Sequence, residues 1–201
     1  GKSSIMAGGR ATYSDWILKS LDEENLKNSK ASFYDAIVKF NHKFNDNNKI
    51  EATFYISNDK FNISSDSLFN YSNRLATLKY SRKFNDKNNG QLVLTNTEYK
   101  FGINYESNNL NAFDFGYKLN ETQVLAKFNY LLNDKHKITY GISSKLYGIR
   151  PGFLNPKNEE SLLNRTDIAK ERGLESGAHI SDSYTVNDKL LIDVGFRYST
   201  F

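Results

Sequence analysis

The sequence predicts an all-β chain, an antiparallel meander of about nine long strands that forms part of a transmembrane β-barrel wall. Three observations lead to this prediction. Apolar and polar residues alternate over long runs. Asn-Asp pairs begin at Asn45, Asn85, Asn133 and Asn187, each between two such runs. The remaining connections are long and polar.

The alternation gives each run one apolar and one polar face, as strands with a period of two require. Before the first Asn-Asp pair, Val38 and Phe40 alternate with Lys39, and after it Ile50 to Ile56 continue the pattern. Similar runs follow along the chain. Together they predict strands near residues 3–18, 32–44, 49–60, 73–84, 91–107, 112–132, 137–150, 174–186 and 189–201.

The connections between these strands are of two kinds. Asn and Asp favour tight turns, because both side chains bond local backbone and both tolerate left-handed conformations. The spacing of the four pairs is too irregular for a solenoid. Long polar connections at residues 19–30, 62–72 and 155–173 fall on the opposite side, and the last of them is expected to hold a short helix at Glu159–Asn164.

Two places depart from simple alternation. The parity of the apolar residues changes between Leu94 and Tyr99, and again across Leu119–Gln123. Each change predicts either a β-bulge or a strand that leaves its apolar environment, because a slip of one residue inverts every side chain. Asp182 also lies on the apolar side of its run, and the sequence offers no explanation for it.

Strand length favours a membrane barrel over a soluble sandwich. Sandwich strands average about 5–6 residues, whereas a strand that crosses a bilayer needs about 9–11. Short turns on one side and long loops on the other are typical of outer-membrane barrels. The polar face would then line a lumen, which explains a mean hydropathy of −0.64. The cations expected in that lumen are Lys39, Lys79, Lys127 and Arg197.

Phe44 and Phe84 stand directly before Asn-Asp pairs. In a barrel they would belong to an interfacial aromatic girdle. In a soluble β-protein they would simply end strands of the core.

The composition and the two ends of the sequence narrow the possible functions and the expected extent of the barrel. The net charge of +4 is spread evenly and Cys is absent, so neither a nucleic-acid surface nor a thiolate metal site is indicated. The sequence begins without Met or an apolar leader, and we expect no signal peptide. Bacterial barrels of a single chain have an even number of strands. We therefore expect residues 1–201 to be a partial barrel, a fragment without a plug whose ends Gly1 and Phe201 cut through the wall.

No catalytic motif, cofactor fingerprint or metal-ligand spacing is present, and we expect no enzyme, no cofactor and no metal site. The three histidines, His42, His136 and His179, are far apart in sequence and are expected to be solvated or to face the lumen. The segment from Asp46 has Ile50 where a calcium loop needs an oxygen ligand.

The residues that bind a ligand cannot be assigned from the sequence. Aromatic residues on the polar parity could stack on a sugar or a chelate, or could reflect only the preference of Tyr for strands. They are Tyr55, Phe69, Tyr71 and Tyr147.

Three segments resemble the barrel of TonB-dependent outer-membrane receptors, especially those with a carboxypeptidase-regulatory-like domain ahead of the plug: Gly8–Lys19, Asn111–Gly152 and Glu171–Phe201. The resemblance lies in the pattern of strands and turns and extends over essentially the whole chain. It implies a barrel of about 22 strands around a plug, in the cell outer membrane, that imports a scarce ligand. The implied partners are outer-membrane lipid, the rest of the barrel, the plug and, through an N-terminal part, the inner-membrane TonB complex.

Two other functions remain open from the sequence. One is a passive porin-type channel, which would have neither plug nor energy input. The other is a secreted soluble β-protein that binds glycans. Siderophore, glycan, peptide and cobalamin importers would share the same wall, so the imported ligand is left unassigned.

Overall fold

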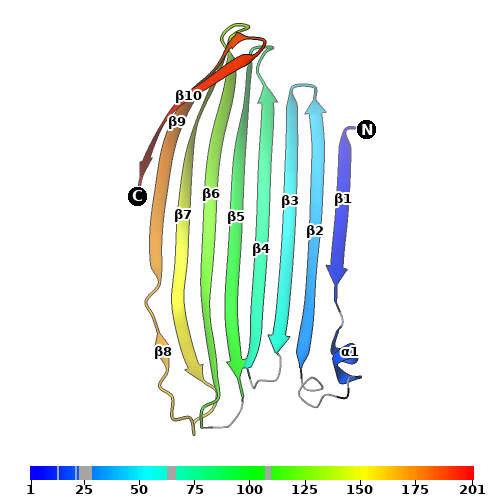
Figure 1. Ribbon diagram of the computed structural model, residues 1–201, viewed down its shortest axis with the longest axis vertical. Coiled ribbons are helices and arrows are strands. Elements are labelled where there is room, and N and C mark those ends of the chain that lie inside the picture. Colours follow the sequence, from blue (N-terminus) through cyan, green and yellow to red (C-terminus); the bar gives the residue numbers. More distant parts are fainter. Residues whose placement is uncertain (13, 21, 23–28, 63–66, 107–109) are drawn as a thin grey trace.

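A computed structural model describes the chain except residues 13, 21, 23–28, 63–66 and 107–109 (Figure 1). The strands form one 10-stranded antiparallel sheet in the order β1-β2-β3-β4-β5-β6-β7-β9-β10, with β8 paired to β7. Neighbours in the sheet follow each other in the sequence, apart from the short β8. The predicted all-β meander is confirmed.

The long strands mostly coincide with the predicted ones. Their bounds are β1 Ser3–Ala11, β2 Lys30–Asn45, β3 Asn48–Asn62, β4 Ser67–Lys83, β5 Asn88–Tyr105, β6 Phe113–Leu131, β7 His136–Pro156, β9 Glu171–Asn187 and β10 Leu190–Thr200. The short elements are β8 Thr166–Asp167 and the helix α1 Asp15–Lys19. No helix in the described part of the chain has the length and hydropathy to cross a membrane.

The Asn-Asp pairs form tight turns, all at one end of the sheet, uppermost in Figure 1. In each turn the Asn side-chain oxygen accepts a hydrogen bond from the backbone N–H two residues later, at 2.9–3.0 Å. Asn therefore supplies the acceptor that closes the turn. The residues are Asn45, Asn85, Asn133 and Asn187.

Two predicted elements have different bounds in the structure. The first strand ends at Ala11 rather than near residue 18, because the consecutive apolar residues of Trp16–Leu18 break the alternation and α1 forms instead. The predicted loop at 62–72 is shorter, since β4 begins at Ser67. Within that loop, and within the predicted loop at 19–30, residues 63–66 and 23–28 lie outside the described residues.

The short helix predicted at Glu159–Asn164 is wrong. The backbone N–H of Leu162 donates to the carbonyl oxygen of Leu110 at 2.8 Å, and the Ser161 hydroxyl bonds the same carbonyl oxygen. These bonds tie the segment to the loop before β6. A single long bond, from the Ser161 N–H to the carbonyl oxygen of Asn158 at 3.4 Å, reaches back within the segment, and no helical ladder forms. The two-residue strand β8 follows it.

The parity changes are explained by a change of surroundings and not by a bulge at either place. The pairings β4–β5 and β5–β6 keep one register throughout. The irregularity near this region is a shift in β6–β7 between Gly116 and Lys118. Beyond Leu94, one face of the sheet becomes polar while the opposite face gains aromatic residues. Of the two explanations, the strand leaving an apolar environment is the one that the structure supports.

The sheet is a single layer with an exposed apolar face. Ala112 is the one buried apolar residue among those described. Large side chains on one face remain exposed, including Phe54 at 56%, Ile142 at 64% and Val194 at 67%. We call this face the outer face and its apolar part the apolar belt. The belt includes Val38, Phe54, Leu78, Leu94, Val124, Ile142, Ile180 and Val194, which the strand pairing places on one side of the sheet.

The height of the apolar belt matches a bilayer. On β2 it runs from Tyr34 to Phe44. At about 3.4 Å per residue and a strand tilt of about 40°, this stretch spans roughly 26 Å along the barrel axis, against about 25 Å for the apolar band of outer-membrane barrels. The sheet therefore has the architecture of a barrel wall.

Candidate ligand-facing inner wall

The face opposite the apolar belt is the inner wall. The four cations predicted to face the lumen all lie on it, because the pairing sets them opposite other polar or inner-wall residues: Lys39 beside Thr53, Lys79 beside Glu51, Lys127 beside Gln91 and Arg197 beside His179. Their placement on the polar face is confirmed.

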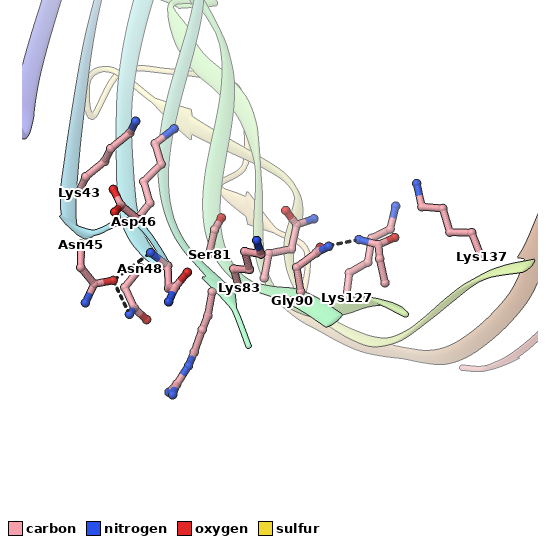
Figure 2. Close-up of a pocket in the computed structure, with 15 residues that line it drawn as sticks. Lys43, Asn45, Asp46, Asn48, Ser81, Lys83, Gly90, Lys127 and Lys137 are labelled. Atoms are coloured by element: carbon pink, nitrogen blue, oxygen red, sulfur yellow. Dashed lines mark hydrogen bonds between the residues drawn. The ribbon is translucent and has the colours of Figure 1, made fainter. Parts of the chain in front are cut away.

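At the short-turn end, the inner wall carries a cluster of lysines. A hollow of about 550 Å³ is lined by Lys43, Lys49, Lys83, Lys127 and Lys137, together with Arg82, Asp46 and the Asn, Gln and Ser side chains of neighbouring strands. Figure 2 shows Lys43 and Lys137 projecting to the same side of the curved sheet. We call these five residues the lysine cluster.

Carboxylates neutralise only part of the lysine cluster. Glu51 bridges Lys49 at 2.8 Å and Lys79 at 3.1 Å. In a tight turn, Lys83 donates to Asp86 at 2.6 Å, and this hydrogen bond lowers the pKa of the Asp86 carboxyl. The excess of positive charge gives this end of the inner wall a field that attracts anionic groups.

At the long-loop end, the inner wall is aromatic. The ring of Phe101 lies 5.1 Å from Tyr71, 5.2 Å from Tyr117, 6.4 Å from Phe69 and 6.5 Å from Phe115, measured between ring centroids. Tyr99, Tyr105 and Phe113 extend the same surface through pairs at 5.8 and 5.3 Å. We call these eight residues the aromatic wall. It presents half-buried rings from β4, β5 and β6.

The aromatic candidates from the sequence are all on the inner wall, but they are not gathered in one place. Phe69 and Tyr71 belong to the aromatic wall. Tyr55 lies opposite Ile37 and Leu75, and the Tyr147 hydroxyl donates to Glu175 Oε2 at 3.0 Å. No observation connects these last two to the aromatic wall.

The aromatic residues of β5 and β6 were missed as candidates in the sequence. The signal that marks them is the inversion of parity after Leu94. Where the outer face no longer meets an apolar environment, apolar residues move to the inner face. Phe101 and Tyr117 occupy this inverted parity on neighbouring strands.

The histidines are not brought together. His179 lies on the inner wall opposite Arg197. His42 and His136 lie on the outer face near the short turns, where both are partly exposed, so they are solvated rather than facing the lumen. His136 Nδ1 lies 2.6 Å from Asp182 Oδ2, which explains the carboxylate on the apolar parity of β9. In the described part of the chain, no group of three or more His, Cys, Asp or Glu residues could hold a metal ion.

Three solved structures with a similar fold are outer-membrane β-barrel proteins. The copper transporter OprC superposes with a TM-score of 0.69 at 9% identity, covering 85% of this chain and 28% of OprC. FpvA of P. aeruginosa, in its complex with a pyoverdine and iron, gives 0.67 at 10%, covering 85% and 30%. BauA, the ferric preacinetobactin receptor from Acinetobacter baumannii, gives 0.55 at 8%, covering 84% and 34%.

The chain spans about a third or less of the length of these three proteins. No protein-family model matches the sequence, and no curated protein matches it. The similarity establishes the fold, an antiparallel meander like the barrel walls of these proteins.

Proposed function

We propose that this chain is part of the barrel wall of a TonB-dependent outer-membrane receptor, a protein that takes up a scarce ligand across the cell outer membrane. The observation that carries the proposal is the division of a single-layer sheet into an exposed apolar belt and an inner wall of cations and aromatic rings. The belt faces lipid, and the inner wall faces the lumen, where the plug and the ligand are bound.

The apolar belt favours this proposal over a secreted soluble protein that binds glycans. Apolar surface in water costs about 25 cal/mol per Å². A soluble chain covers such surface with a second layer, and the described residues contain none. In lipid the belt needs no cover, and pairing between neighbouring strands satisfies the backbone polar groups.

The aromatic wall favours a receptor over a passive porin. The interior of a porin is polar because it conducts water and small solutes. The aromatic wall instead offers ring faces inside the barrel, at the end where a ligand from outside would arrive. Rings of this kind stack on planar groups, sugars or chelates. The structural neighbours OprC, FpvA and BauA are TonB-dependent receptors, and their similarity to this chain also favours a receptor over a porin.

The two ends of the inner wall would act in sequence. A ligand entering from the long-loop side first contacts the aromatic wall around Phe101. The lysine cluster lies deeper, where it attracts acidic groups of the ligand or of the plug. The TonB complex would supply the energy for passage through the plug, outside the residues of this chain.

A vesicle experiment separates the receptor from the porin. The complete protein that contains this chain is reconstituted into phosphatidylcholine vesicles, and vesicle swelling in a small sugar such as arabinose is followed by light scattering. A receptor with its plug in place gives no more swelling than empty vesicles. Swelling at the rate of a general porin would refute the proposal.

A cell experiment tests energised uptake. The same protein is expressed in hosts with and without TonB, and accumulation of radiolabelled ferric siderophores, copper, cobalamin and oligosaccharides is measured. At least one ligand should accumulate only in the host with TonB. Phe101→Ala should reduce its accumulation several-fold, whereas Leu92→Ala on the apolar belt should leave it unchanged. Equal accumulation in both hosts for every ligand transported would contradict the proposal.

A further inference from the structure

Two hollows lie along the same strands on the outer face of the sheet. The first, of about 470 Å³, is apolar and lies within the belt over β5, β6, β7, β9 and β10. Small residues at Ala126 and Ala178 form its floor between the larger Leu92, Ile142 and Tyr198. Two serines also line this hollow, and the hydroxyls of Ser144 and Ser176 bond each other at 2.9 Å.

The second hollow, of about 540 Å³, lies nearer the long loops and is lined by Lys118, Arg150, Lys170 and Arg172. The strands β6, β7 and β9 border both hollows. Ser144 borders the apolar hollow and Gly148 the basic one. Four residues of extended strand separate these positions by about 13 Å. The basic hollow is therefore just above the apolar belt, at the depth of lipid headgroups.

Positive charge exceeds negative charge around the basic hollow. Lys100 and Lys118 share Glu98, and Arg150 pairs with Asp167 at 2.8 Å. Within the described part of the chain, Lys170 and Arg172 form no ion pair. Five cations thus outnumber these two carboxylates, and still do so with Glu171, which borders the hollow from an inner-wall position.

The guanidinium of Arg150 is held in place on two sides. Its Nη2 bonds Asp167, and its Cζ lies 4.3 Å from the centroid of the Phe153 ring. A guanidinium group presents paired N–H donors that fit phosphate oxygens. Arg172 and Lys170 add donors that no carboxylate occupies. The hollow thus combines a fixed cation with two available ones.

We propose that the two hollows form one binding site for a membrane lipid whose headgroup carries phosphate. An acyl chain lies in the apolar hollow, and the phosphate oxygens accept hydrogen bonds from Arg172 and Lys170, beside the fixed charge of Arg150. Charge complementarity selects an anionic headgroup, and the apolar hollow selects a lipid over a free anion. The site rests on the proposed function to the extent that the outer face must face lipid.

Native mass spectrometry tests the site. The complete barrel protein, in a nonionic detergent, is titrated with lipid A, which carries two phosphates, and with phosphatidylcholine as the zwitterionic comparison. Wild-type protein should retain lipid A at lower concentration than phosphatidylcholine. Removing two charges with Lys170→Gln and Arg172→Gln should weaken retention of lipid A roughly 30-fold.

Two further variants control for charge and for shape. Lys87→Gln with Lys135→Gln removes the same charge from tight turns at the other end of the sheet and should leave retention of lipid A unchanged. Ala178→Phe fills the apolar hollow without changing charge and should weaken retention. The heat-dependent gel mobility of folded barrels confirms that each variant folds.

Four results would overturn the site. Equal loss of lipid A in both charge variants would show general electrostatic attraction only. Displacement of lipid A by millimolar inorganic phosphate would show a site for free anions. The complete protein is also partitioned between a detergent phase and an aqueous phase. Recovery of the wild type in the detergent phase, with no preference for lipid A, would refute the site but leave the receptor proposal standing. Recovery in the aqueous phase without detergent would refute both.

Discussion

Replacing one aromatic residue of the apolar belt by arginine should destabilise the barrel far more than the same replacement at the neighbouring residue of the inner wall. Phe54 is exposed on the outer face and pairs with Val38, near the midpoint of the apolar belt on β2. Arg at the bilayer midplane of a barrel costs about 2–4 kcal/mol. Phe54→Arg should therefore lower the free energy of unfolding by about this amount and raise the unfolded-to-folded ratio roughly 30- to 1,000-fold.

The adjacent residue provides the matched control. Tyr55 is also aromatic but lies on the inner wall, where a charge stays in water, so Tyr55→Arg should cost about 1 kcal/mol or less. Both free energies are measured by urea unfolding of the complete barrel in phosphatidylcholine vesicles, with gel mobility reporting the folded fraction. Equal costs for the two variants, or a larger cost for Tyr55→Arg, would refute the assignment of the faces.

Three smaller effects follow from individual contacts. In the same urea assay, Gly141→Val should lower the free energy of unfolding by about 1–3 kcal/mol, because a Cβ at this position would collide with a carbonyl oxygen of β6. Gly148→Val should cost less, because a Cβ there would lie 4.0 Å from its nearest neighbouring atom, and equal costs for the two variants would contradict this. Asn133→Ala removes the side-chain oxygen that accepts hydrogen bonds from two N–H groups of the turn, at 2.9 and 3.0 Å. It should lower the free energy of unfolding by about 1–2 kcal/mol, and unchanged hydrogen exchange of these N–H groups would contradict their pairing with Asn133. The hydrogen bond from Arg150 lowers the pKa of the Asp167 carboxyl below its ordinary value of 3.8. The pair therefore stabilises the fold above pH 3.8, and this stabilisation is lost as the pH falls through the lowered pKa. An NMR titration should find the low pKa in the wild type and a return to the ordinary value in Arg150→Gln, and an unchanged pKa in that variant would exclude the ion pair as its cause.

The features that the sequence predicts correctly are local. The turn at Asn133 depends on its own side chain and the two following N–H groups. The assignment of Val38 and Lys39 to opposite faces depends only on their being neighbours in a strand. Both kinds of information are contained in a few consecutive residues, so the turns, most strands and the lumen lysines could be read directly.

The features that were missed depend on pairing between distant segments. The helix predicted at Glu159–Asn164 is prevented by hydrogen bonds to the loop before β6. The close contact of His136 with Asp182 needs the register of β7 against β9. The aromatic wall forms because Phe101 and Tyr117 are opposite each other in β5 and β6. Periodicity within one strand carries none of this information.

A scan of spin labels along β3 tests the central claim most directly. The chain has no Cys, so single Cys substitutions from Ile50 to Ser57 place each label without ambiguity in the complete barrel in vesicles. Collision rates with oxygen and with a water-soluble nickel chelate should alternate with a period of two, oxygen being higher at positions 50, 52, 54 and 56 and nickel higher at the positions between. Low collision rates with both reagents at Phe54, as in a packed protein interior, would contradict the account.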